Sequence, residues 1–278
     1  KDIGKKIEFK LWNNPDELRA LILKKEVDFI ALPTNVAANL YNKGIDLKLL
    51  NVSTWGILGL VSRDKNLKNI EDFKNKEIIV PFRADMPDII FQALIKKANL
   101  NIKKDFKLTY VATPIDAMQM LILRRADHAL LAEPAISIAL RKTGSFPVKL
   151  IAPDLYRSVD LQKDWGRLFE VEPKIPQAGL AIIGETQGKE QLITKILEEY
   201  EKAINWYKSN QKDASELVVK TLPMLEVNGL ADSIDYIKFE NINAQNSKKD
   251  VEFFFSVLLE NDSKIIGGKL PDDNFYYK

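Results

Sequence analysis

Short strand-like segments alternate with amphipathic helical segments across residues 7–183 of this chain. The strand-like segments show alternating or continuous apolar residues, and the segments between them carry apolar residues at helical spacing. We predict strands at residues 7–11, 27–32, 47–52, 56–61, 77–82, 107–111, 127–132, 148–151 and 178–183. Because strands that alternate with helices pair mostly in parallel, this order predicts an α/β fold with mixed, mostly parallel sheets.

The pattern changes beyond residue 188, where strand-like segments largely cease. Residues 188–262 carry apolar residues at helical spacing and are expected to form several helices. The expected packing residues are Trp206, Leu217, Val218 and the three phenylalanines at 253–255. The sequence therefore predicts a helical C-terminal segment.

One order of elements occurs twice. Residues 21–28 contain the end of a helix, a pair of basic residues and an aspartate. They are followed by an apolar strand, a helix that begins after a proline, and Gly44. Residues 121–127 are followed by the same elements and Gly144. This separation is too long for a stacked array, so the pattern predicts one α/β unit used twice. The alternative is that any two amphipathic helices that precede strands look alike.

Two similar units would give the chain two lobes. We expect the chain to cross between them near residues 63 and 180, so that residues 1–62 and 181–278 form one lobe and residues 63–180 the other. Ligands of open parallel sheets bind beyond the carboxyl ends of the strands, where helix N-termini present free N–H groups. Two such edges would enclose one cleft that closes on a small ligand.

Charge and residue counts exclude several function classes. The 41 basic and 39 acidic residues are interspersed, which argues against nucleic-acid binding because that needs basic residues gathered on one face. The absence of cysteine excludes disulfides, thiolate metal sites and cysteine nucleophiles. The single histidine, His128, lies inside a predicted apolar strand and is expected to be structural. We therefore expect no cofactor and no enzymatic activity.

Several short motifs resemble one known family. They are residues 26–28, 70–76, 132–135, 165–166, 175–180, 266–271 and 275–277. Together they resemble the periplasmic substrate-binding proteins of ABC importers, in the branch that handles nitrate, sulfonates and thiamine precursors. Family members start with a strand and a helix before the segment that begins here near Ile7, so the resemblance implies that the first lobe lacks this opening unit.

The resemblance also implies a way of working. It implies a type II periplasmic-binding-protein fold, a small anionic or zwitterionic ligand, an ABC transporter membrane permease as partner, and a monomer. No segment is apolar enough to span a bilayer, and residues 1–6 are not a signal peptide. We expect a periplasmic protein whose export signal has been removed, or one anchored to the membrane outside the cytoplasm.

Candidate ligand-binding residues of the first lobe lie where strands end and helices begin. They are Asn13, Asn14, Thr34, Asn35 and Trp55. The asparagines and the threonine are also good N-caps, and the tryptophan could pack in the core instead, so both interpretations stay open for each.

Candidate residues of the second lobe lie on similar turns. Arg83, Asp85 and Met86 join a strand to a helix, and Thr113 precedes Pro114 as an N-cap. Arg83 is the expected partner of an anionic group, because a guanidinium forks onto a carboxylate or sulfonate; its alternative is a surface pair with Asp85.

Glu133 follows an apolar strand and precedes Pro134 at a helix start. A carboxylate at this position complements the helix dipole, and it could also accept a hydrogen bond from a ligand amine, amidine or hydroxyl.

Two other functions use the same fold class. A relative of the family makes a thiamine pyrimidine with its own histidine, iron and a cysteine-rich motif, so an enzyme is one alternative; this chain has neither the cysteines nor a second histidine. The other alternative is the ligand-sensing ectodomain of a receptor.

The sequence alone leads to the expectation that, where Arg83 is the partner of the acid group, Arg83→Ala lowers affinity for the ligand with little loss of folding stability, because an arginine on a turn binds an acid group without packing in the core. Calorimetric titration with the ligand measures this, and unchanged affinity removes Arg83 from the site.

Overall fold

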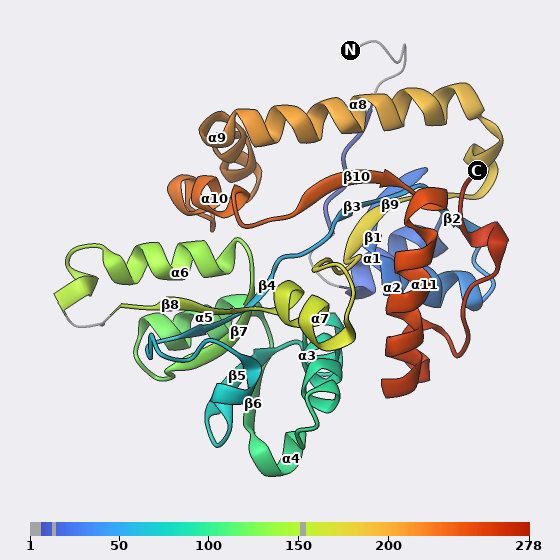
Figure 1. Ribbon diagram of the computed structural model, residues 1–278. Helices are drawn as coiled ribbons and strands as arrows, with labels where there is room; N and C mark the ends of the chain where they lie inside the picture. Colours follow the sequence, from blue (N-terminus) through green and yellow to red (C-terminus); the bar gives the residue numbers. More distant parts are fainter. Residues whose placement is uncertain (1–6, 13–14, 151–153) are drawn as a thin grey trace. The chain divides into compact units, whose positions relative to one another are not determined.

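Two compact units make up the computed structural model, which describes residues 7–12, 15–150 and 154–278. Unit 1 comprises Lys1–Thr54, Pro176–Trp206 and Glu240–Lys278, and unit 2 comprises Trp55–Ile175 and Tyr207–Phe239. Each unit contains one five-stranded sheet and several helices (Figure 1). The predicted α/β class is confirmed. The sheet of unit 2 is mixed and partly parallel, whereas the described pairings with the central strand of unit 1 are antiparallel, so parallel pairing is less common than the predicted mostly parallel sheets.

Strand β9 organises the sheet of unit 1. β9 (Ala178–Ile183) pairs antiparallel with β1 (Phe29–Pro33), β2 (Leu47–Leu49) and β3 (Asn51–Thr54), and β10 (Phe239–Asn243) lies beside β3. The close approach of β3 to β9 requires a glycine, because a Cβ on Gly179 would lie 1.9 Å from the carbonyl oxygen of Asn51.

Helices and short 3-10 turns complete unit 1. They are α1 (Pro15–Leu23), α2 (Thr34–Asn42), η3 (Gly184–Gly188), α8 (Glu190–Ser209), α11 (Ala244–Asn261), η4 (Ser263–Ile266) and η5 (Asp273–Phe275). Phe254 and Phe255 of α11 are fully buried, as predicted. The expected burial of Trp206 and Leu217 is wrong, because both lie on the solvent side of amphipathic helices.

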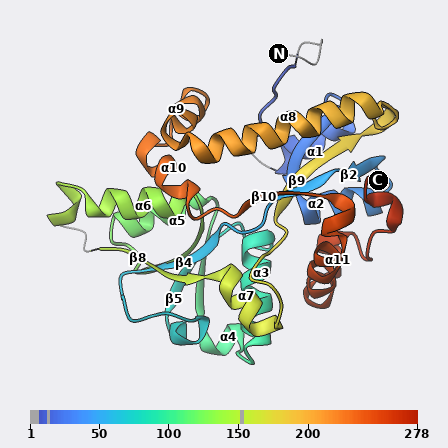
Figure 2. The same ribbon diagram turned by 45° about the horizontal axis from the view of Figure 1, so that its top comes forward.

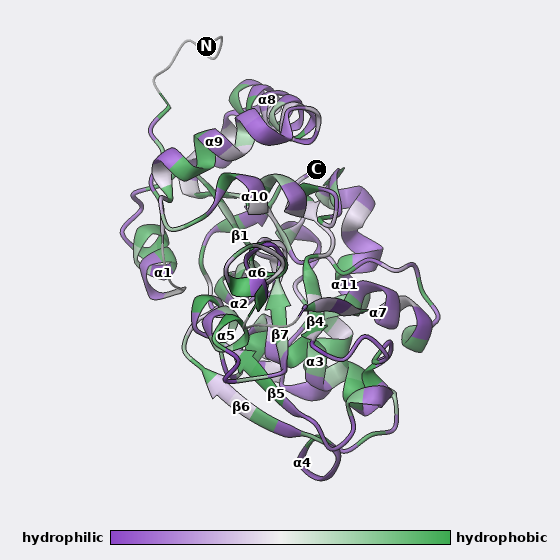
Figure 3. Cartoon of the chain, turned by 90° about the vertical axis from the view of Figure 1, so that its left-hand side faces the viewer, coloured by the Kyte–Doolittle hydropathy of each residue, from purple (hydrophilic) through white to green (hydrophobic). Residues whose placement is uncertain are grey.

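The sheet of unit 2 has the order β6-β5-β7-β4-β8. Its strands are β4 (Leu58–Ser62), β5 (Glu77–Pro81), β6 (Lys107–Val111), β7 (His128–Ala132) and β8 (Tyr156–Asp160). β5 pairs in parallel with β6 and β7, whereas β4 is antiparallel to both β7 and β8. Hydrophobic residues are concentrated on β5 and β7 (Figure 3), and β4 and β7 are almost wholly buried.

The helices of unit 2 follow the predicted order through residue 144. The helices and turns are η1 (Ile70–Phe73), α3 (Met86–Lys97), α4 (Ile102–Asp105), α5 (Pro114–Ile122), α6 (Ala135–Gly144), η2 (Val148–Leu150), α7 (Leu161–Phe169), α9 (Gln211–Thr221) and α10 (Val227–Ile234). Figure 2 shows α10 beside α6. The contact is close, since a Cβ on Gly229 would lie 2.6 Å from Ile138 Cγ1. This packing groups residues 207–239 with unit 2, whereas the sequence assigned them to the first lobe.

Two predicted strands are wrong. Residues 7–12 form no strand, because no strand in the described part of the chain pairs with them, and the side chains of Ile7, Phe9 and Leu11 are exposed. Residues 148–150 form the 3-10 turn η2, and residue 151 lies outside the described residues. The strands β8 and β10 were not predicted, because polar residues interrupt their apolar pattern.

The repeated order of elements has a repeated local conformation. In each copy a nine-residue helix precedes a five-residue strand, α1 before β1 and α5 before β7. A basic residue in each connection has positive φ, 55° at Lys25 and 58° at Arg124. In each turn this residue donates its backbone N–H to the carbonyl three residues earlier, at 3.0 Å and 3.1 Å respectively. These shared features support one α/β unit used twice; superposition of residues 14–44 on 113–144 remains the direct test.

His128 is a buried structural residue, as predicted. It begins β7, its Nδ1 lies 2.9 Å from the hydroxyl of Ser62, and its ring packs edge-on against Phe73. Burial lowers the pKa of His128 below its ordinary value of 6.5; the neighbouring Lys76 acts in the same direction, and Asp127 and Asp64 oppose it. In the described part of the chain no helix is long and apolar enough to cross a membrane.

This pKa shift predicts a loss of stability in acid. Below pH 6.5 the unfolded chain binds a proton at His128 before the folded protein does, so stability present above pH 6.5 is lost as the pH falls through the lowered pKa. Urea denaturation of the unaltered protein and of His128→Gln between pH 8 and pH 5 measures this. The difference in unfolding free energy between the two proteins should stay constant above pH 7.5. In acid the unaltered protein should lose more stability than His128→Gln; a constant difference throughout contradicts the prediction.

Candidate functional site

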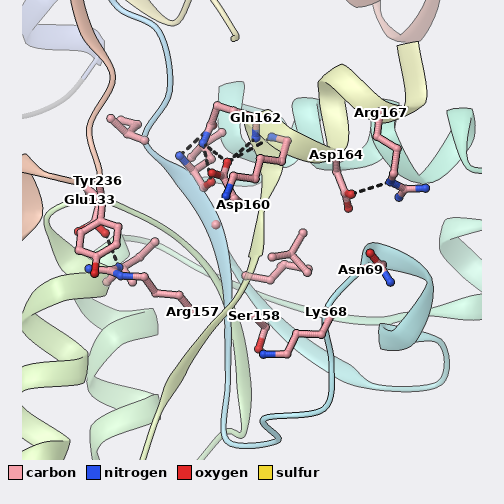
Figure 4. A pocket seen from close by; sticks show the side chains of 17 residues that line it. Lys68, Asn69, Glu133, Arg157, Ser158, Asp160, Gln162, Asp164, Arg167 and Tyr236 are labelled. Carbon is pink, nitrogen blue, oxygen red and sulfur yellow. Dashed lines mark hydrogen bonds and ion pairs between the residues drawn. The ribbon is translucent and has the colours of Figure 1, made fainter. Parts of the chain in front are cut away.

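Unit 2 contains a cavity of about 550 Å³. Its walls come from Ile57 and strand β4, strand β8 and helix α7, with single residues from other elements: Lys68, Asn69, Glu133, Ile136 and Tyr236. Figure 4 shows these side chains from close by.

Apolar groups form one part of the wall. They are Ile57, Leu58, Leu60, Ile136 and Val159. Gly59 lies among them, where a Cβ would come within 3.0 Å of the carbonyl oxygen of Val159 and 3.2 Å of Ile136 Cδ1. A ligand with a carbon body can bury that body against this surface.

A buried carboxylate forms the centre of a polar cluster. Glu133 is 6% exposed and accepts hydrogen bonds from the backbone N–H and the hydroxyl of Ser137, at 3.1 Å and 2.8 Å. Arg157 Nη1 forms an ion pair with the other carboxylate oxygen, and its Nη2 donates to the Ser137 hydroxyl at 2.6 Å. The guanidinium carbon lies 3.6 Å from the ring centre of Tyr236 (Figure 4).

Local sequence explains part of this cluster. Glu133 follows β7 and precedes α6, and Ser137 lies four residues later, so the carboxylate meets an N–H of the first turn of the helix. Burial raises the pKa of Glu133 above its ordinary value of 4.5, while Arg157 and Ser137 act in the opposite direction. A buried carboxylate is stable here because Arg157 and Ser137 satisfy its oxygens.

A second polar group stabilises the opposite wall. Asp160 caps α7 by accepting the backbone N–H groups of Gln162 and Lys163, at 2.9 Å and 3.3 Å. The Gln162 side chain exchanges two hydrogen bonds with the backbone of Leu58, at 3.2 Å and 3.1 Å. These partners belong to unit 2 itself, so the protein alone satisfies these polar groups of the wall.

Three polar groups of the wall remain available. The hydroxyl of Ser158 is buried and has no hydrogen-bond partner. Lys68 and Lys163 have no ion-pair partner among the residues that the structure describes. The lining holds four basic residues, the two lysines, Arg157 and Arg167, against three acidic ones. The wall therefore has a small excess of positive charge.

Of the predicted site residues, Glu133 lines this cavity. Asn13 and Asn14 lie outside the described residues. Thr34 and Asn35 are buried at the start of α2 in unit 1, where Thr34 donates to the carbonyl of Pro176 at 2.6 Å and Asn35 Oδ1 has no partner. Their expected capping role is not observed, because Pro33 is the N-cap.

The other predicted residues belong to unit 2, but they do not line the cavity. Trp55 is fully buried, with Lys174 Nζ 5.0 Å from its ring. Arg83 is exposed, and its guanidinium lies 5.2 Å from the ring centre of Tyr110. Asp85 and Thr113 are the N-caps of α3 and α5, and Met86 is buried.

Most residues of the cavity wall were not predicted as site residues from the sequence. Arg157 and Ser158 lie on β8, a strand whose pattern is too polar to predict, and Tyr236 follows α10 about 80 residues later in the chain. Among the missed residues, Asp160 and Asn69 carried a local signal, since an aspartate or asparagine before a helical segment is a common N-cap.

Comparisons with known proteins place the fold. No family model and no curated protein matches the chain. An ABC transporter protein from Parabacteroides distasonis is 25% identical, with a TM-score of 0.80 over 99% of this chain and 89% of that chain. The chain has the fold of ABC-importer binding proteins.

Two further structures agree with this fold. The ligand-binding component of an ABC-type import system from Staphylococcus aureus is 13% identical, with a TM-score of 0.65 over 98% of this chain and 84% of that chain. The periplasmic aliphatic sulphonate binding protein of Escherichia coli is 17% identical, with a TM-score of 0.65 over 95% and 86%. The resemblance inferred from the motifs is confirmed for the fold.

We predict strong energetic coupling between Glu133 and Arg157. Arg157→Gln leaves the buried carboxylate without its partner and should cost about 2–3 kcal/mol of unfolding free energy, whereas Glu133→Gln/Arg157→Gln should cost less than the two single variants together. Urea denaturation measures the cycle.

The exposed pair Arg141–Asp232, 2.7 Å apart, is the matched control. Its Gln and Asn variants should change stability by less than about 1 kcal/mol. Additive costs at Glu133 and Arg157 would contradict the coupling.

Proposed function

We propose that this protein is the solute-binding component of an ABC importer. Its ligand is a small anionic or zwitterionic solute of the sulfonate, nitrate or pyrimidine and thiamine-precursor class. The observation that carries the proposal is the likeness to an ABC transporter protein over 99% of the chain at a TM-score of 0.80. One protein of the same fold binds aliphatic sulphonates.

The cavity of unit 2 is the proposed ligand site. A volume of about 550 Å³ lies within the range of small-molecule pockets. Its apolar surface suits a carbon body, and the excess of basic residues suits an acid group. The hydroxyl of Ser158 offers one further hydrogen bond, because it is buried without a partner.

The state of the carboxylates favours binding over catalysis. Glu133 is paired with Arg157, Asp160 caps α7, and Asp164 accepts a hydrogen bond from Arg167 Nε at 3.0 Å. Each acidic group of the wall is thus engaged with the protein, and none is presented as a free acid or base. The protein acts as a carrier and does not transform its ligand.

The carrier role implies a partner and a location. The ligand is handed to a membrane permease of the ABC class, as the import systems of similar fold imply. The protein works outside the cytoplasm, in the periplasm or tethered to the membrane surface, and it carries the ligand as a monomer.

A thermal-shift panel tests this function. The panel contains alkanesulfonates, taurine, nitrate, a hydroxymethylpyrimidine and neutral analogues of each size. One acid class should raise the melting temperature in a saturable way, since a ligand at about 100 times its Kd adds about 2.7 kcal/mol of stability. No stabilising compound, or conversion of the bound compound to a product detected by NMR, would contradict the proposal.

A further inference from the structure

Arg157 is held by three residues of unit 2. Its Nη1 pairs with Glu133, its Nη2 donates to the Ser137 hydroxyl at 2.6 Å, and one face lies 3.6 Å from the ring centre of Tyr236. Glu133 and Ser137 are themselves hydrogen-bonded at 2.8 Å, so they meet the guanidinium from the same side. The orientation of Arg157 is therefore set by the protein.

The remaining donors of Arg157 define a second edge. A guanidinium has five N–H donors, and the contacts with Glu133 and Ser137 use one on each terminal nitrogen. The Nε–H and the second hydrogen of Nη2 have no partner among the described residues. These two N–H groups point the same way, at a spacing that matches two oxygens of one acid group.

The other arginine of the cavity offers no such edge. Arg167 Nε donates to Asp164 at 3.0 Å, and its Nη2 donates to both carboxylate oxygens of Glu71 at 3.1 Å. Two carboxylates therefore occupy the Nε–H and Nη2 donors of Arg167, whereas the same donors of Arg157 face no carboxylate among the described residues.

We propose that Arg157 is the residue that recognises the acid group of the ligand, through two parallel hydrogen bonds from its Nε–H and Nη2–H. Glu133, Ser137 and Tyr236 are positioning residues that hold this edge toward the cavity. The inference rests on the proposed function and names the chemistry of the site: an organic acid with two accepting oxygens and a carbon body that covers the apolar wall.

The charges of Glu133 and Arg157 favour an acid group with two oxygens over a spherical anion. Glu133 offsets the charge of Arg157, so a spherical anion gains little from entering the site. An acid group with two oxygens gains directional hydrogen bonds that do not depend on net charge. Chloride should therefore compete poorly with a carboxylate or a sulfonate.

The decisive variant is Arg157→Lys, which keeps the positive charge and removes the two-donor edge. Calorimetric titration uses 1-butanesulfonate, pentanoate and the neutral pentanamide as probes. We expect one of the two acids to bind the unaltered protein, pentanamide to bind at least tenfold more weakly, and Arg157→Lys to lose at least tenfold in affinity for that acid. Arg141→Lys, on the exposed face of α6, should leave the affinity unchanged.

The positioning role has its own test at the exposed Tyr236. Tyr236→Phe keeps the ring under the guanidinium and should keep the affinity, whereas Tyr236→Leu removes it and should weaken acid binding severalfold without changing the melting temperature of the free protein. Equal affinity of the two variants would overturn the positioning role.

Folding defects are separated from binding defects by Glu133→Gln/Arg157→Gln, which leaves no buried charge unpaired. It should fold and bind neither acid. Retained acid binding in this variant or in Arg157→Lys, or a loss in Arg83→Ala instead, overturns the inference while the importer role stands. If no compound of the larger panel binds the unaltered protein, the proposed function fails as well.

Discussion

Pairing of strand β4 along both edges determines how the chemistry of unit 2 is assembled. β4 runs antiparallel to β7 and to β8, with Leu58 opposite Ala132 and Val61 opposite Arg157. Glu133 follows Ala132 directly, so these ladders bring a carboxylate at the end of one strand near a guanidinium on another. Backbone hydrogen bonds fix this approach, because each buried N–H and C=O group of the sheet needs a partner.

The Glu133–Arg157 pair then shapes the cavity. Removing the Glu133 carboxylate, which is 6% exposed, from water costs free energy, and the contacts with Arg157 and Ser137 offset that cost. Ordering a long arginine side chain costs up to about 2 kcal/mol, and folding meets that cost before any ligand arrives. A guanidinium fixed in this way is preorganised for binding. The same contacts that stabilise unit 2 therefore prepare its proposed ligand site.

Local chemistry made part of the site predictable. Asp85 and Thr113 lie at strand-to-helix turns as expected, and both cap the following helix. Their oxygens are engaged by backbone N–H groups, which explains why a residue at the right end of a strand need not face a ligand. Glu133 satisfies the same rule and does line the cavity, because its carboxylate also meets Arg157. The rule identifies an edge of the sheet, and tertiary contacts select among its residues.

The sequence by itself determined the α/β class, the repeated helix–strand–helix order and most elements through residue 144, because apolar periodicity and capping act over a few residues. It also determined that Glu133 lies at a strand end. Tertiary structure alone decided the antiparallel insertion of β9 and the grouping of residues 207–239 with unit 2. It also decided the meeting of Glu133, Arg157 and Tyr236. These three residues are distant in the chain, and strand register and helix packing, which no local pattern encodes, bring them together.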